Sequence, residues 1–535
     1  MTSLYSLCSR GSHLFPLAVT GEVLDEHPYL LHAQWTPVGH GIVLVHDYDV
    51  FYRPSPKSPH AFRVSKTAVP GVIYNGIPDW LYEEEILGDS KALWLSADGQ
   101  MLLYACFNDT LVEEFKFPWY GVNQETQQLY PQIRSLRYPK AGTTNPHVTL
   151  YVADLADPKN IRTRDLKPPM ALDQNVFSGY YFTAVSWVSS TEVAVVWMNR
   201  AQNVTMVTLC KSPVWFCQEA QRVSGENRGW VESPGAPVFS PDGNTYLTLA
   251  PIRDGTSGYF RHVVAVNIPK KRFLPLTDGK YDVVRISAWD HTNQIVYGGP
   301  GSQLVTERWK VDWATFLASA MDIIVGQIDG RGSSGRGYAL MHQVYKKLGS
   351  VEVSDQLEVT EYLRDSLHFI DKRRIGVWGW SYGGFVAAML LSAPDQDIFK
   401  CGIAIAPVTS WRLYDSAYTE RYMGLPNATG NYRSYEESDL SRRVEGFRDK
   451  GLYLVHGTAD DNVHLQHGLR LARALSDAGV VFTQQIYPDE NHSLSGVKRH
   501  LYRSMSHFLE DCFRKQIPQE MKAGLRSGGT SPPEW

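Results

Sequence analysis

The chain lacks any uninterrupted run of about twenty apolar residues, the length that an α-helix needs to cross a bilayer. Its N-terminal stretch, residues 1–20, lacks the basic start and the continuous apolar core of a secretion signal. An excess of charge of one sign is also missing, because 52 Lys and Arg residues face 56 Asp and Glu residues, for a formal net charge of −4. We therefore expect no anchor or signal peptide in this chain, and no binding to nucleic acid or to an anionic membrane surface.

Cysteine is scarce, with six in 535 residues, and low-complexity tracts are absent. Two pairs could form disulfides, because Cys210 and Cys217 lie close together across a turn and Cys401 and Cys512 flank the C-terminal region. The remaining two, Cys8 and Cys106, have no evident partner.

Three sequons for N-glycosylation are present, at Asn108, Asn203 and Asn427. Together with two possible disulfides they favour an oxidising, extracellular or cell-surface setting. The missing export signal then conflicts with the expected location.

The first half of the chain, up to about residue 293, has the pattern of an all-β protein. Short alternating strands are separated by Gly, Pro, Asp and Asn, and an aromatic residue precedes a tight turn at intervals of roughly fifty residues. The repeated segments are Trp35–Gly39, Trp94–Gly99, Trp187–Ser190 and Phe239–Gly243. This spacing favours a β-propeller of four-stranded blades over residues 1–293, with a β-sandwich as the alternative.

The second half, residues 294–535, alternates apolar strands with amphipathic helices. Strands are predicted over Asp322–Gln327, Ile403–Ala406, Leu452–His456 and Phe482–Tyr487, and helices over Glu352–Asp365, His464–Ala478 and His500–Lys515. Such alternation is typical of a mostly parallel sheet that is covered on both faces. We therefore predict an α/β hydrolase domain after an all-β domain.

A nucleophile elbow lies within this second half. The segment Gly379–Gly383 fits Gly-x-Ser-x-Gly, follows the apolar run Ile375–Trp378 and precedes an apolar helix over Val386–Leu391. A strand that ends in a sharp turn holds a serine hydroxyl clear of the sheet, and small residues on either side permit the turn. Ser381 is thus the predicted nucleophile, although the pentapeptide alone could be a glycine-rich turn.

The acid and the base of an α/β hydrolase follow the serine in the order Ser, Asp, His, each in a loop after a strand. Asp460 and His492 meet this requirement. The alternatives are Asp461 as the acid and His456 or His464 as the base. The expected roles are proton transfer by His492 and orientation of its imidazole by Asp460, which need no metal or cofactor.

The oxyanion of the tetrahedral intermediate needs two hydrogen-bond donors. The backbone N–H of Tyr382, directly after the nucleophile, is one candidate. The hydroxyl of Tyr297, in a Gly-rich loop, is the other.

Long motifs in the second half resemble the prolyl oligopeptidase family, in its dipeptidyl peptidase IV and fibroblast activation protein group. They are Asp329–Ser333, Trp378–Gly384, Tyr418–Gly424 and His456–His464. In the first half, Asp79–Glu85 is similar to the double-glutamate motif of that group. The resemblance implies a serine exopeptidase that releases dipeptides from free N-termini when the second residue is proline or alanine.

The resemblance also assigns roles to individual residues. Glu84 and Glu85 would bind the α-ammonium group of a peptide substrate, and Tyr382 would help to wall a flat apolar pocket for the proline ring. The rest of the pocket would comprise Val408, Trp411, Tyr414, Tyr418 and Val463, with Asn462 bound to the substrate backbone. The same resemblance implies the disulfides Cys210–Cys217 and Cys401–Cys512 and a homodimer.

Three departures from the family pattern are visible. First, the membrane anchor and the first propeller segment of the family are missing, and with them the substrate-binding arginine that is expected upstream of residue 1. Second, the propeller stops after roughly six blades. Third, the first strands of the hydrolase domain are mostly missing. These gaps would expose strand edges and apolar faces. Three alternatives therefore stand beside the enzyme: a catalytically impaired isoform, a propeller protein that only binds partners, and a cytosolic dipeptidyl peptidase.

Overall fold

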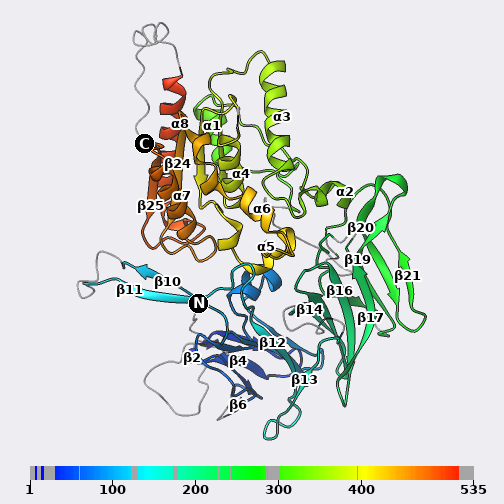
Figure 1. Cartoon of the computed structure of the whole chain (residues 1–535). Coiled ribbons are helices and arrows are strands. Elements are labelled where there is room, and N and C mark those ends of the chain that lie inside the picture. The colour runs from blue at the N-terminus through cyan, green and yellow to red at the C-terminus, as the bar shows by residue number, and fades with distance from the viewer. Residues whose placement is uncertain are drawn as a thin grey trace.

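The computed structural model of the protein describes residues 6–8, 14–16, 30–58, 61–121, 129–170, 172, 179–225, 229–240, 242–284, 286, 301–394 and 396–516. An all-β portion comes first, and an α/β portion follows from residue 301 (Figure 1). The prediction of an all-β region followed by an α/β hydrolase domain is confirmed. Across these described ranges, no helix has the length and apolar character required to cross a membrane.

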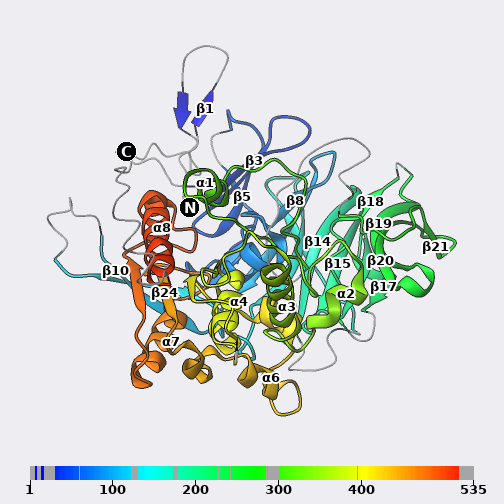
Figure 2. The same cartoon turned by 90° about the horizontal axis from the view of Figure 1, so that it is seen from above.

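Four antiparallel sheets follow one another along the all-β portion (Figure 2). The first contains β3 (His32–Trp35), β4 (Ile42–His46), β5 (Asp49–Arg53) and β6 (Phe62–Arg63), and the second β7 (Ile73–Asn75), β8 (Leu93–Leu95), β9 (Met101–Asn108), β12 (His147–Asp154) and β13 (Arg162–Leu166). The third contains β14 (Tyr180–Ser189), β15 (Glu192–Asn199), β16 (Val204–Lys211) and β17 (Phe216–Ser224), and the fourth β18 (Val238–Phe239), β19 (Thr245–Arg253), β20 (Tyr259–Asn267) and β21 (Arg272–Pro275). Two hairpins complete the set, β1 (Ser6–Cys8) with β2 (Leu14–Pro16) and β10 (Glu114–Trp119) with β11 (Gln132–Arg137).

Two of the four repeated segments predicted from the sequence share one turn geometry. Gly99 and Gly243 both have positive φ, 72° and 68°, at the turns β8–β9 and β18–β19. In each turn a serine hydroxyl donates to the aspartate two residues later, at 2.6 Å in one and 2.5 Å in the other. Closure of the sheets into a circular propeller, and its roughly six blades, stay predictions.

The α/β portion is built on a parallel sheet in the order β22 (Gly376–Trp380), β23 (Cys401–Ile405), β24 (Gly451–Gly457) and β25 (Thr483–Tyr487). Its helices are α1 (Trp313–Ala320), α2 (Tyr338–Met341), α3 (Val351–Ser366), α4 (Tyr382–Leu391), α5 (Ser416–Met423), α6 (Tyr432–Glu437), α7 (Gln466–Asp477) and α8 (Lys498–Lys515). The short helical turns of the described chain are η1 (Tyr82–Leu87), η3 (Gly255–Ser257), η4 (His342–Val344), η5 (Trp411–Leu413), η6 (Leu440–Arg442), η7 (Val444–Phe447) and η8 (Ser495–Val497).

Alternating residues of the central strands face two different cores. Ile403 and Ile405 of β23 pack with apolar residues of α1 and α8, whereas Ala404 packs on the opposite side with residues of α4 and α7. Both faces of the sheet are therefore covered, as expected for parallel strands. The disulfide Cys401–Cys512 joins β23 to α8, and Cys210–Cys217 joins β16 to β17, so both predicted disulfides are present.

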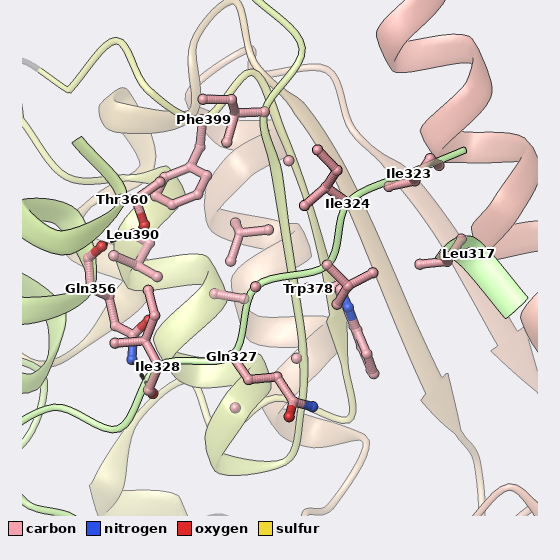
Figure 3. A pocket seen from close by; sticks show the side chains of 18 of the residues that line it. Leu317, Ile323, Ile324, Gln327, Ile328, Gln356, Thr360, Trp378, Leu390 and Phe399 are labelled. Atoms are coloured by element: carbon pink, nitrogen blue, oxygen red, sulfur yellow. Dashed lines mark hydrogen bonds between the residues drawn. The ribbon is translucent and has the colours of Figure 1, made fainter. Parts of the chain in front are cut away.

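The sheet has an open edge at β22, where a cavity of about 1360 Å³ follows the strand. In Figure 3, Ile324 and Gln327 from an extended segment line this cavity together with Trp378 from β22. The prediction of a strand over Asp322–Gln327 is wrong, because this segment is extended but pairs with no strand among the described residues. A strand requires backbone hydrogen bonds to a neighbouring strand. Here the cavity, which is lined by both this segment and β22, lies between them.

From the cavity we predict that two isoleucines contribute differently to the free energy of unfolding. Ile324 is 65% exposed, whereas Ile403 of β23 is completely buried. We expect Ile324→Ser to change the free energy of unfolding by less than about 0.5 kcal/mol, whereas Ile403→Ala should cost about 2–5 kcal/mol. Denaturant unfolding of the two variants measures this difference, and equal losses would show that Ile324 is covered in solution.

Candidate active site

The nucleophile elbow has the geometry predicted for it. Ser381 follows β22 and is the N-cap of α4, with φ 60° and ψ −118°, a backbone conformation that non-glycine residues rarely adopt. Its N–H donates to the carbonyl of Ile405 at 2.9 Å, which fixes the turn to the neighbouring strand β23. A Cβ atom at Gly379 would lie 2.0 Å from the carbonyl oxygen of Gly383, so only glycine fits there. Strain at a single serine that the fold holds in place is typical of a functional site.

Asp460 and His492 form a hydrogen-bonded pair. His492 Nδ1 lies 2.9 Å from Asp460 Oδ2. Burial favours the neutral form of Asp460, but the charge of His492 and hydrogen bonds hold the pKa of this carboxyl well below its usual value. An ionised carboxylate can only accept, so Nδ1 carries the proton and Nε2 is the basic nitrogen.

The pKa of His492 is raised above its usual value. Burial lowers it, but the charge of Asp460 and the hydrogen bond between the two side chains outweigh that effect. The loop of His492 is also held near the elbow, because Trp380 Nε1 donates to the carbonyl oxygen of His492 at 3.1 Å. The histidine is thereby oriented from both sides.

The structure separates this pair from the alternatives. Asp461 accepts a hydrogen bond from Trp80 instead of from a histidine, at 3.3 Å. His456 Nε2 lies 2.7 Å from the carbonyl oxygen of Val463, as expected for a structural histidine, although it is also 3.4 Å from Asp460. His464 stacks on the ring of Phe115 at 3.5 Å. The geometry thus favours Asp460 and His492.

Of the two predicted oxyanion donors, one lies in the described chain. Tyr382 is the first residue of α4, where N–H groups lack partners within the helix and the helix dipole favours negative charge. Its hydroxyl donates to Glu352 at 2.8 Å, which fixes the ring. Tyr297 lies outside the described residues.

The residues predicted for the proline pocket form one aromatic cluster beside Tyr382. The ring of Trp411 lies 5.6 Å from that of Tyr382 and stacks on Tyr418 at 6.0 Å. Tyr414 lies 5.4 Å from Tyr418, and its hydroxyl donates to Asn462 Oδ1 at 2.8 Å. The buried side chains of Val408 and Val463 belong to the same core.

The paired glutamates lie on η1, with Glu84 exposed and Glu85 partly buried. Burial raises the pKa of Glu85 to about 7; Arg421 opposes this rise and Glu84 adds to it. Burial and the charge of Asp461 raise the pKa of Glu84. Glu84 in turn contributes to the raised pKa of His492, so these two side chains interact electrostatically.

Several contacts that position the site were not predicted. Arg421 of α5 donates to the carbonyl oxygen of Glu85 at 3.3 Å. The neighbouring Glu420, almost fully buried, pairs with Arg200 of the all-β portion at 2.6 Å. Both α5 residues lie in the motif Tyr418–Gly424, so the motif was the available signal, but their partners are more than 200 residues away.

The hairpin β10–β11 also supports the catalytic loops, and no sequence signal pointed to it. Beside the stacking of Phe115 on His464, the backbone N–H groups of Tyr120 and Gly121 donate to the Asp489 carboxylate at 2.9 and 2.7 Å. Asp489 lies three residues before His492. The all-β portion thus contacts the loops that carry Asp460 and His492.

The three sequons differ in accessibility. Asn427 is exposed, whereas Asn108 and Asn203 are partly buried. The Asn108 side chain accepts from the Thr110 hydroxyl at 2.6 Å, and that of Asn203 from Asn199 at 2.8 Å. Glycosylation at these positions stays a prediction.

Two family models match the chain. Residues 13–314 match the dipeptidyl peptidase IV (DPP IV) N-terminal region, and residues 309–516 match the prolyl oligopeptidase family. The crystal structure of Porphyromonas gingivalis dipeptidyl peptidase 4 is similar in fold, with a TM-score of 0.73, 24% identity, and coverage of 93% of this chain and 84% of that one.

Similar proteins include peptidases and a relative that is named inactive. Prolyl endopeptidase FAP from Bos taurus is 31% identical, and the match covers 90% of this chain and 79% of that protein. Venom dipeptidyl peptidase 4 from Apis mellifera is also 31% identical, and the match covers 90% of this chain and 78% of that protein. Inactive dipeptidyl peptidase 10 from Mus musculus is 29% identical, covering 95% and 80%. The alignment with the Bos taurus protein spans 617 residues, whereas this chain has 535, so that protein carries segments that this chain lacks.

Proposed function

This chain belongs to the prolyl oligopeptidase family, and on that premise we propose that it is a serine exopeptidase that releases dipeptides from free N-termini when the second residue is proline or alanine. The observation that supports the proposal is the Asp460–His492 pair, whose loop is bonded to Trp380, the residue before the strained Ser381, and whose histidine interacts electrostatically with Glu84. The triad supplies acyl transfer, and the glutamates supply selection for a free N-terminus.

The reaction proceeds through an acyl-enzyme. His492 Nε2 accepts the proton of Ser381 Oγ as this oxygen attacks the carbonyl carbon of the second substrate residue, and the N–H of Tyr382 stabilises the oxyanion. His492 then gives the proton to the leaving amine, and a water molecule hydrolyses the ester by the same steps in reverse. Asp460 stays ionised and stabilises the imidazolium.

The substrate is selected at two points. The aromatic cluster of Trp411, Tyr414 and Tyr418 offers flat apolar surface to a proline ring, and Glu84 and Glu85 pair with the α-ammonium group. The first test is hydrolysis of a Gly-Pro chromogenic amide by the purified protein. Absence of hydrolysis would overturn the proposal and favour a role in binding.

The pKa of Glu85 predicts how ammonium binding depends on pH. Because burial raises this pKa to about 7, Glu85 loses its charge as the pH falls below 7, and a dipeptide amide should bind more weakly. Above about pH 8 the ligand amine itself loses its proton. The inhibition constant of an unreactive dipeptide amide should therefore be lowest between about pH 7 and 8. In Glu85→Gln the weakening below pH 7 should shrink, whereas an identical pH profile in both proteins would contradict this role of Glu85.

The setting of the enzyme is part of the same proposal. Two disulfides favour an oxidising compartment, and thus a secreted or cell-surface protein. A mass shift on treatment with a glycosidase would test this location. A homodimer, expected from the family resemblance, is tested by sedimentation of the purified protein.

A further inference from the structure

A hydrogen bond between a tryptophan and a carboxylate joins the glutamate segment to the loop of the catalytic acid. Trp80 Nε1 donates to Asp461 Oδ2 at 3.3 Å, across 381 positions of sequence. Trp80 lies two residues before η1, which carries Glu84 and Glu85, and Asp461 directly follows Asp460. The bond therefore joins the segment that carries the paired glutamates to the loop that carries Asp460.

A second contact runs beside this bridge. The ring of Tyr138 lies 4.4 Å from that of Trp80, and its hydroxyl donates to the carbonyl oxygen of Asn462 at 2.9 Å. Tyr138 is almost fully buried. Two consecutive residues of the catalytic loop, Asp461 and Asn462, are thus attached to the all-β portion.

The far side of η1 is held as well, because Arg421 of α5 donates to the carbonyl oxygen of Glu85. The glutamate segment therefore lies between two supports, α5 on one side and the loop of Asp460 on the other. Asp461 and Glu84 both raise the pKa of His492, and Asp461 also raises the pKa of Glu84, so these three side chains interact electrostatically.

We propose that the Trp80–Asp461 bridge sets the distance between the ammonium-binding glutamates and Ser381, and so fixes the length of the released product at two residues. The inference rests on the proposed function and makes Asp461 a positioning residue. An extended chain advances about 3.3 Å per residue, whereas an error of about 1 Å in the reacting geometry already costs about a hundredfold in rate. An anchor that can shift by a residue would therefore lose the distinction between dipeptides and tripeptides.

The test compares Gly-Pro and Gly-Gly-Pro chromogenic amides in three variants, Trp80→Phe, Asp461→Ala and Asp461→Asn. Loss of the bridge in Trp80→Phe or Asp461→Ala should lower the preference for the dipeptide amide about tenfold, chiefly through KM. Asp461→Asn retains an oxygen acceptor for the indole and should stay within about threefold of the unaltered protein. Trp187→Phe is the matched control, because it removes an indole–carbonyl hydrogen bond of 3.0 Å to Trp94 within the all-β portion.

Labelling by a fluorophosphonate reports the reactivity of Ser381 without the ammonium anchor. We expect the labelling rate of Asp461→Ala to stay within about twofold of that of the unaltered protein. A large loss of labelling would overturn the inference, because the electrostatic effect of Asp461 on His492 would then outweigh its role in positioning the glutamates. If the unaltered protein is active and both Trp80→Phe and Asp461→Ala keep its preference for the dipeptide amide, this inference is wrong, whereas the proposed function stands. An unaltered protein that cleaves neither amide would overturn the proposed function and this inference with it.

Discussion

Replacement of Ser381 by alanine is expected to lower kcat for a Gly-Pro chromogenic amide by about 10⁴-fold or more, because the covalent step loses its nucleophile. Removal of the serine alone costs about as much as removal of the whole triad, so the residual rate should reflect only substrate binding and oxyanion stabilisation. The measurement is the initial rate of the purified variant beside that of the unaltered protein.

A matched serine separates chemistry from folding. Ser354, exposed on α3, is remote from the elbow in sequence, and Ser354→Ala should retain full activity. Equal melting temperatures for the two variants would show that the loss at Ser381 is chemical. If Ser381→Ala hydrolysed the amide as fast as the unaltered protein, the serine peptidase mechanism would be wrong for this chain.

Acetylation of the substrate N-terminus is expected to lower kcat/KM by about 10²- to 10³-fold, because Glu84 and Glu85 lose their ammonium partner, which also offsets the partial burial of Glu85. The acetyl group also adds bulk, so the blocked substrate alone does not identify the glutamates. The measurement is therefore a double-mutant cycle that combines the blocked and free substrates with the unaltered protein and a Glu84→Gln/Glu85→Gln variant.

The cycle isolates the interaction of the ammonium group with the carboxylates. In the glutamine variant, acetylation should have a much smaller effect than in the unaltered protein, because no charge is left to pair. Glu113→Gln/Glu114→Gln, on and beside the hairpin strand β10, changes an equal number of charges outside η1 and serves as control. Equal effects of acetylation in all three proteins would exclude the glutamates as the ammonium site.

Local signals in the sequence predicted much of this molecule. The elbow at Ser381, the helix over His500–Lys515 and the repeated turns at Gly99 and Gly243 all depend on residues within a few positions of one another, and the structure has them. The same local reasoning was wrong for Asp322–Gln327. Alternation of apolar residues is sufficient to predict an extended chain, but a strand also needs a partner.

The candidate site shows a similar division. Order along the chain was sufficient to select Asp460 and His492, because each follows a strand of a parallel sheet. It left Asp461 as the alternative acid, since both aspartates lie in one loop. Their different partners, Trp80 for the one and His492 for the other, are set by tertiary contacts.

The sequence by itself therefore determined the fold class and the family and proposed the reacting groups, because these depend on short motifs and their order. Only the tertiary structure decided how the glutamates stand relative to the triad. Trp80, Tyr138 and Arg421 come from distant parts of the chain and meet at the junction of the two portions. Such contacts leave no periodic or local pattern, since they arise from how two folded units pack together.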